Sequence, residues 1–192
     1  MTDYKNLVAK TIEQHIGRAF AQYYPVIPLA NLQPENGQGP RTLGEDRIVL
    51  PDFAVAAKDF GYFDVKVKAA SNYYRNWNRD EHGINLAHFD AYRTFEQRFE
   101  RHVALVVAEL NTGKLLACTL SDLTAFGDPR IGTWSNNGAQ SINWNRMAFT
   151  EVGTFDIPND DLTRTSITLN PKPVQMLLRQ LQLPLQEELQ HA

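Results

Sequence analysis

The chain has 192 residues, of which 43% are hydrophobic and 21% are charged, values that are ordinary for one globular domain with a sizeable core. Its net charge of -3 excludes the broad basic surface of a general nucleic-acid coat, but it leaves room for a local basic groove. The first residues lack the apolar run of a signal peptide, and no stretch approaches the ~20 apolar residues of a membrane span, so we expect a cytoplasmic protein with no membrane partner.

The first predicted element is an amphipathic helix over residues 3–23. Glu13 lies at the border of its apolar stripe, about 100° round the helix axis from the neighbouring apolar position. Two prolines end the helix, and the Asn, Gln, Gly and Pro of residues 31–46 predict a loop, with Glu45 near its end. The stripe consists of side chains at helical spacing, namely Val8, Ile12, Ile16, Ala19, Phe20 and Tyr23.

Two strands joined by a turn are predicted next, over residues 47–55 and 62–68. The first is rich in β-forming residues, and the second alternates between charged and apolar side chains. Because side chains two apart on a strand share a face, the second strand has a charged row opposite an apolar row that can pack on a core. The charged row is Asp64, Lys66 and Lys68, and the apolar row is Phe63, Val65 and Val67.

The charged row lies next to Asp52, which the preceding strand carries. Two carboxylates can hold Mg²⁺, which polarises a phosphate oxygen and lowers the pKa of a bound water. A lysine beside them can orient the attacking water or stabilise the developing charge. This combination of groups indicates metal-assisted hydrolysis of phosphodiester bonds, and a solvated sheet face with alternating charges is the alternative interpretation.

Pro51, Asp52, Asp64 and Lys66 match the motif of the PD-(D/E)xK nuclease superfamily, and the order of elements over residues 4–122 resembles its restriction-endonuclease-like fold. The resemblance implies an α/β three-layer sandwich, in which helices flank a central mixed sheet of four to six strands. It also implies a Mg²⁺-dependent nuclease, with Mn²⁺ as a substitute, that cuts DNA rather than RNA. A homodimer is a further expectation, because enzymes of this fold that cut both strands commonly pair two subunits by symmetry.

The same resemblance implies roles for individual residues. Asp52 and Asp64 would bind the metal, with the backbone carbonyl of Val65 as a further ligand. Lys66 would orient or activate the water and stabilise charge on the phosphate. Lys68 is a second base that the minimal motif does not need, and we assign it to contact with nucleic acid.

The first helix of this family often supplies one more acid to the metal site. Glu13 is the residue that we choose for this role, as a metal ligand and catalytic group, because it lies at the border of the predicted apolar stripe. Glu45 is the alternative, because it comes just before the strand that carries the first part of the motif.

Residues 71–79 interleave aromatic side chains with arginines and contain no acid. Aromatic rings can stack on bases and arginines can pair with phosphates, so we predict a loop that contacts nucleic acid. A polar surface loop with partly buried aromatic rings is the alternative. The predicted contacts are Tyr73, Tyr74, Arg75, Trp77 and Arg79.

A second helix is predicted over residues 84–101. Its expected core contacts are Leu86, Phe89, Phe95 and Phe99, and Tyr92 is assigned to its polar or amphipathic positions. Some members of the family place a Gln or Tyr from this helix near the scissile phosphate. His88 with Tyr92, one turn apart, is one candidate for that position, and Gln97, which we assign to contact with nucleic acid, is the other.

The apolar run at residues 103–110 predicts a central strand buried on both faces. A turn and a returning strand over residues 114–120 complete a hairpin. Cys118, the only cysteine, lies in that strand and is predicted to be a packed thiol. We therefore expect a nuclease-like core over residues 1–122, and an extension of the same domain over residues 123–192 with extra strands and a terminal helix within 171–190.

Several other classes of protein lose support. The sequence contains no Gly-x-x-x-x-Gly-Lys, Gly-x-Gly-x-x-Gly or Gly-x-Ser-x-Gly motif and no His-x-x-x-His zinc spacing. His88 and Asp90 match the His-x-Asp pair of iron-dependent oxygenases, but the helical period there opposes the strand that such a fold requires. Two alternatives to the nuclease stay open: a non-catalytic nucleic-acid-binding or assembly protein on the same fold, and an unrelated α/β protein.

Overall fold

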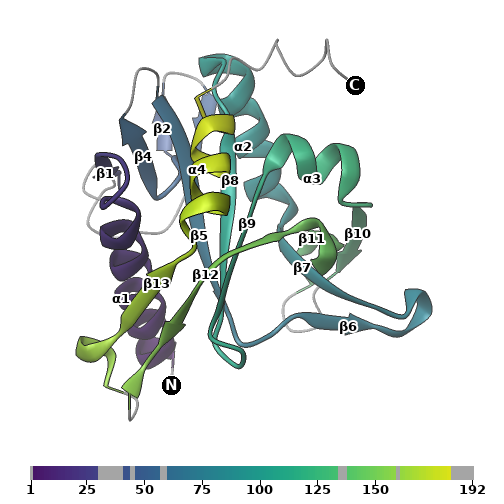
Figure 1. The fold of residues 1–192 in the computed structure, drawn as a ribbon. Coiled ribbons are helices and arrows are strands. Elements are labelled where there is room, and N and C mark those ends of the chain that lie inside the picture. The colour runs from purple at the N-terminus through teal and green to yellow at the C-terminus, as the bar shows by residue number, and fades with distance from the viewer. Residues whose placement is uncertain are drawn as a thin grey trace.

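The computed structural model describes residues 2–29, 41–43, 46–56, 60–133, 138–158 and 161–182. These residues form a large sheet, a smaller sheet, a two-stranded ribbon, and helices on both faces of the large sheet (Figure 1). No helix in these ranges is both long enough and apolar enough to cross a bilayer. The helices are α1 (Thr2–Phe20), α2 (Leu86–Phe99), α3 (Leu120–Phe126) and α4 (Pro171–Gln180).

The large sheet is mixed and has seven strands, more than the four to six expected. β5 and β8 pair in parallel, and the other neighbouring strands pair antiparallel. β8 is buried along its whole length, and the predicted hairpin of β8 and β9 is confirmed. In order across the sheet the strands are β1 (Val26–Pro28), β4 (Phe53–Ala56), β5 (Phe60–Lys68), β8 (Val103–Glu109), β9 (Lys114–Thr119), β12 (Thr150–Asp156) and β13 (Ser166–Leu169).

The smaller sheet is built partly from the segment that connects β5 to β8. The loop predicted over residues 71–79 is wrong, because this segment forms β6, the short helix η2 (Arg75–Trp77) and the start of β7. β6 pairs with β7 in a local hairpin, and β7 in turn pairs with β11 far along the chain, which local composition does not reveal. The order across this sheet is β10 (Arg130–Thr133), β11 (Gln140–Asn145), β7 (Arg79–Asn85) and β6 (Asn72–Tyr74), and the separate ribbon pairs β2 (Arg41–Leu43) with β3 (Asp46–Ile48).

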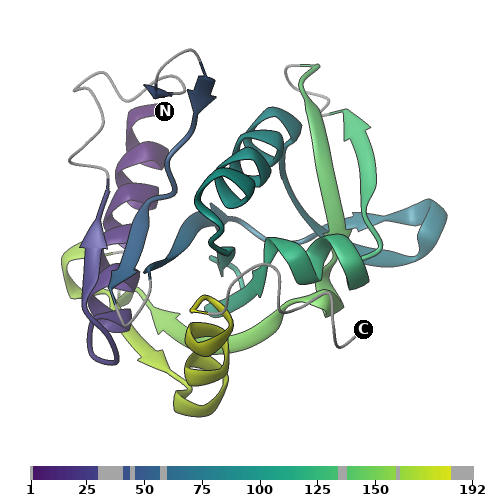
Figure 2. The same cartoon turned by 90° about the horizontal axis from the view of Figure 1, so that it is seen from above.

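A hydrophobic core covers each face of the large sheet, which gives the expected three layers (Figure 2). On one face, the predicted stripe of α1 packs with α4 against β5; Ile12, Ile16 and Phe20 of α1 meet Phe63 and Val65. On the other face, α2, α3 and the smaller sheet cover β8 and β9. This second core includes Tyr92, Phe95, Leu105, Val107, Leu120, Leu123, Ile142 and Trp144.

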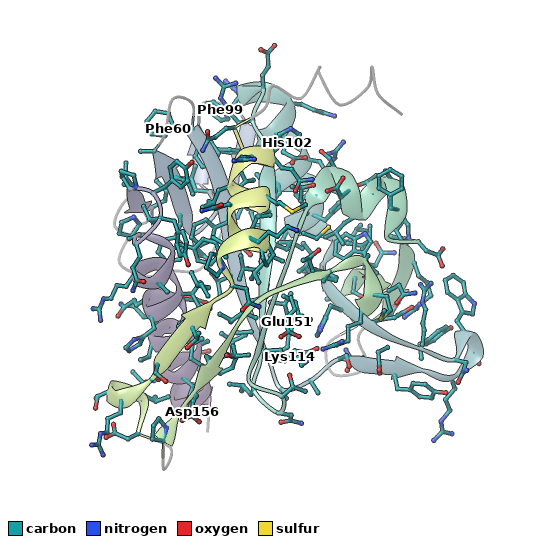
Figure 3. All side chains as sticks on the ribbon, viewed as in Figure 1. Phe60, Phe99, His102, Lys114, Glu151 and Asp156 are labelled. Carbon is teal, nitrogen blue, oxygen red and sulfur yellow. The ribbon has the colours of Figure 1, made fainter. Side chains whose placement is uncertain are left out.

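Some local predictions differ from the structure for physical reasons. The strand predicted over residues 47–55 is divided into β3 and β4, because Pro51 between them has no N–H with which to continue a ladder. Phe99, predicted in the core, is 40% exposed at the end of α2 (Figure 3). Tyr92, assigned to the polar side of the same helix, is instead fully buried.

The chain after residue 122 contributes to both sheets. It supplies β10 and β11 to the smaller sheet, and it supplies β12 and β13 to the large sheet, beyond β9. The terminal helix predicted within residues 171–190 is α4, which ends at Gln180, and residues 183–192 lie outside the described ranges. β13 and α3 are elements that the sequence did not reveal.

Candidate active site

The antiparallel hairpin of β4 and β5 brings the two parts of the motif together. Phe53 pairs with Phe63, so the next step of the same register places Asp52 opposite Asp64. The Oδ2 atom of Asp52 accepts a hydrogen bond of 2.7 Å from the backbone N–H of Val65. Burial, and then the negative charge of Asp64, raise the pKa of Asp52 well above its ordinary value.

Asp64 and Lys66 share one face of β5, as the alternation of the strand predicts. The Nζ atom of Lys66 lies 2.5 Å from Oδ2 of Asp64, whose carboxylate is buried. Burial lowers the pKa of Lys66, but the carboxylates of Asp64, Asp52 and Glu13 together raise it above its ordinary value. Lys66 is therefore an ammonium ion in this arrangement.

Glu13 reaches the same cluster from α1, on a different layer of the molecule. Burial raises the pKa of Glu13 from 4.5 to about 7, while the positive charge of Lys66 lowers it and Asp64 raises it. The residue chosen from the border of the apolar stripe thus lies within electrostatic range of the motif. Glu45, the alternative acid, lies outside the described residues.

Tyr92 belongs to the cluster, although the sequence pattern assigned it to the polar or amphipathic positions of its helix. Its hydroxyl donates a hydrogen bond of 2.6 Å to Oδ1 of Asp64, and this bond explains why a tyrosine is buried there. His88 lies one turn earlier on α2, with its ring centroid 6.4 Å from that of Tyr92. His88 is exposed, but partial desolvation, followed by the charge of Lys66, lowers its pKa, so the ring lies within electrostatic range of the cluster.

Two residues that we assigned to nucleic acid differ in their relation to the cluster. Lys68 continues the charged row of β5, and burial followed by the charge of Lys66 lowers its pKa. Gln97 is exposed and lies about 140° round α2 from the buried Tyr92, so it points away from the carboxylates. The structure therefore brings Lys68 to the cluster and does not bring Gln97.

The predicted contact residues of the segment 71–79 lie in and beside the smaller sheet rather than at the carboxylates. Tyr73, Arg75 and Trp77 are exposed. Tyr74 and Arg79 are half-buried, and Arg79 forms ion pairs with Glu81 and Asp128. The five residues therefore divide into an exposed group and a group already engaged by the protein.

The ligand chemistry of the carboxylates matches a magnesium ion. Glu13, Asp52 and Asp64 present the hard oxygen donors that Mg²⁺ prefers. The buried Oδ2 of Asp64 accepts no hydrogen bond of ordinary geometry from the described residues, although it contacts the Lys66 ammonium. Among the described residues, no three acidic, histidine or cysteine side chains already surround one point as ligands do, so the oxygens must converge further to bind an ion.

Removing the Tyr92 hydroxyl tests whether this residue positions Asp64. We expect Tyr92→Phe to weaken Mn²⁺ binding or cleavage by about 10- to 100-fold, because Asp64, the predicted metal ligand, would lose the partner that orients it. Calorimetry with Mn²⁺ and a cleavage assay measure the two effects. Tyr62→Phe is the matched control. It removes a hydroxyl from β5, the strand that carries Asp64, at a ring that packs on Phe95. Equal behaviour of the two variants would show that the bond to Asp64 has no positioning role.

Comparisons with known proteins returned similar structures and no similar sequences. No family model matches the chain, and no curated protein matches it. It is similar to the Holliday junction resolvase Hjc of Archaeoglobus fulgidus, an archaeal hyperthermophile, with 8% identity and a TM-score of 0.38 over 67% of this chain and 83% of that one. It is also similar to a nuclease from a fusselovirus, with 12% identity and a TM-score of 0.41 over 78% of this chain and 84% of the other.

The order and pairing of the helices and strands can be compared with the fold that the sequence resemblance predicts. A helix that carries an acid precedes an antiparallel hairpin that carries the motif, and a further helix leads to a strand parallel to the second strand of the hairpin. Helices cover both faces of the mixed sheet that results. This order of elements, and the position of Asp52, Asp64 and Lys66 on the hairpin, agree with the restriction-endonuclease-like arrangement that the sequence resemblance predicts.

Proposed function

We propose that the protein is a metal-dependent nuclease that hydrolyses phosphodiester bonds in DNA. The observation that carries the proposal is the convergence of Glu13, Asp52, Asp64 and Lys66, which come from α1, from the approach to β4 and from β5. Gathering three carboxylates in a largely buried place is electrostatically costly, as the raised pKa values of Glu13 and Asp52 reflect. Such costs are typical of sites that carry out chemistry.

The carboxylates of Asp52, Asp64 and Glu13 would hold the metal, with the carbonyl of Val65 beside them. Mg²⁺ bound there, or Mn²⁺ in its place, supplies Lewis acidity toward a phosphate oxygen and a bound water of lowered pKa. The N–H of Val65 fixes Asp52, and the hydroxyl of Tyr92 fixes Asp64, so both ligands are oriented before an ion arrives.

Lys66 supplies the positive charge that the reaction needs on the protein side. Its ammonium can donate hydrogen bonds to the attacking water, and it can stabilise the extra negative charge on the phosphate as the bond to the leaving oxygen breaks. Asp64 holds the ammonium in place through the contact at 2.5 Å. Lys68, further along the same face of β5, adds positive charge on the side where the strand ends.

A cleavage panel tests the proposal directly. The native chain and Asp64→Asn are compared on supercoiled plasmid, linear duplex, single-stranded DNA, branched DNA and RNA, in Mg²⁺, in Mn²⁺ and in EDTA. We expect cutting of DNA by the native chain in either metal, no cutting in EDTA, and loss of cutting in Asp64→Asn, which keeps the shape of the side chain but not its charge. No cutting of any substrate, together with no Mn²⁺ binding by calorimetry, would contradict the proposal and favour a non-catalytic protein on this fold.

A further inference from the structure

The smaller sheet and η2, which we call the arm, have a face that the active site does not use. One face of the arm packs on the core through buried residues, which include His82, Ile142 and Trp144. The opposite face is polar and carries a groove of about 230 Å³, lined among others by Tyr73, Arg130 and Asn143. The arm projects to one side of the large sheet (Figure 1).

Two large aromatic side chains are exposed at the tip of the arm. Tyr73 is 59% exposed and Trp77 is 48% exposed, although rings of this size are usually buried or placed at interfaces. Contacts within the arm restrain both rings. The hydroxyl of Tyr73 donates a hydrogen bond of 2.5 Å to Asn78, and the guanidinium of Arg79 lies over the Trp77 ring, 4.3 Å from its centroid.

A buried carboxylate holds the cations that lie over Trp77 and its neighbour Tyr74. Glu81 is buried and accepts hydrogen bonds from Nε of Arg79 at 3.0 Å and from Nη2 of Arg130 at 2.6 Å. Arg130 in turn lies over the Tyr74 ring at 3.8 Å, and the Tyr74 and Trp77 rings meet edge to face at 6.1 Å. Trp77 is thus preorganised by a network of ion pairs beneath it, and Tyr73 by its hydrogen bond to Asn78, which lowers the entropy lost when a partner binds.

We infer that Tyr73 and Trp77 form a stacking platform for unpaired bases of DNA, so that the substrate has a single-stranded segment. This inference rests on the proposed nuclease function. Aromatic rings stack on any base through its flat face, but a base within a duplex already has neighbours on both faces. Arg75, which is exposed beside the rings and forms no ion pair with a described residue, is placed to meet a phosphate of the same strand.

The charge of the arm favours unpaired bases over the backbone of a duplex. Glu81 neutralises part of the charge of Arg79 and Arg130, and Asp128 pairs with Arg79, so these arginines add little net charge for binding to phosphates. The chain also joins the arm to β5, the strand that carries Asp64 and Lys66. Three residues separate Lys68, the end of β5, from Asn72, the start of β6, so these two positions lie at most about 14 Å apart.

Binding without metal tests the platform separately from cleavage. Fluorescein-labelled oligothymidylate and an oligoadenylate–oligothymidylate duplex of equal length are titrated in EDTA with the native chain, Tyr73→Ala and Trp77→Ala. We expect each alanine variant to weaken single-strand binding by about 5- to 100-fold, while duplex binding changes less than about twofold. Tyr73→Phe and Trp77→Phe, which keep a ring, are expected to retain most of the affinity, and Phe126→Ala, at another exposed ring, controls for general loss of apolar surface.

The outcomes separate this inference from the nuclease proposal. Equal losses on single strand and duplex, or no loss in either alanine variant, would overturn the platform, whatever the cleavage panel shows. A selective loss on the single strand supports the platform even if the native chain cuts nothing in Mg²⁺, in which case only the nuclease proposal falls. Urea unfolding of each variant shows whether a loss of binding follows from a loss of folded protein.

Discussion

Replacing Lys66 by alanine is expected to lower the rate of DNA cleavage by about 100- to 1,000-fold, as the loss of one electrostatic stabiliser of a transition state does. The variant is not expected to lose its metal. In the native chain the ammonium neutralises Asp64 across 2.5 Å, so its removal leaves the carboxylate free for the ion, and Mn²⁺ binding should stay equal or become tighter. Single-turnover cleavage and calorimetry measure the two effects on the same preparation.

This divergence between cleavage and metal binding distinguishes a catalytic lysine from one that only balances charge. Lys114→Ala is the matched control, because Lys114 pairs with Glu151 at 2.7 Å on two partly exposed side chains of β9 and β12 (Figure 3). That variant should cleave at the native rate. Unchanged cleavage by Lys66→Ala at saturating Mg²⁺ would remove Lys66 from the proposed mechanism.

Replacing Glu109 by alanine is expected to lower the free energy of unfolding by about 3–5 kcal/mol, the cost of leaving buried charges without their partner. Glu109 is 1% exposed and lies at the end of β8. Its carboxylate meets Nε2 of His82 at 2.6 Å, Nε and Nη2 of Arg146 at 2.7 and 2.8 Å, and the hydroxyl of Thr112 at 2.7 Å. One side chain therefore joins the large sheet to the arm and to the turn after β8.

Urea unfolding measures this loss, with Glu151→Ala as the control. Glu151 belongs to an exposed ion pair, and such pairs typically contribute about 0–1 kcal/mol. If Glu109→Ala destabilises no more than Glu151→Ala, the network at the end of β8 does not hold the arm.

The same network is expected to make the stability of the native chain depend on pH under acidic conditions. The hydrogen bonds from Arg146, despite the opposing effect of burial, lower the pKa of Glu109 from 4.5 to about 2. A carboxyl whose pKa is depressed by folding contributes stability that is complete above its unfolded pKa and is lost as the pH falls toward the folded one. Between about pH 4.5 and 2, the native chain should therefore lose more stability than Glu109→Gln, which has no proton to gain.

The sequence pattern predicted those strands and helices in which polar and apolar side chains lie on two distinct faces. The alternation of β5 separated Asp64 and Lys66 from Phe63 and Val65, and the stripe of α1 placed Glu13 at its border. The arm escaped prediction because β7 pairs with β11, more than fifty residues later, and composition alone made its first half resemble a polar loop. Tyr92 escaped because its burial depends on a hydrogen bond to Asp64 that only the folded chain supplies.

The parallel pairing of β5 and β8 has a consequence for the order of events during folding. The hairpin of β4 and β5 is local and can close early, but β8 reaches β5 only after the arm segment and α2 have been traversed, and closing such a long connection is entropically slow. Until then β5 is an edge strand, with Asp64 and Lys66 exposed to water. The side of β5 that carries Asp64 and Lys66 would therefore be enclosed late in folding, together with the second core.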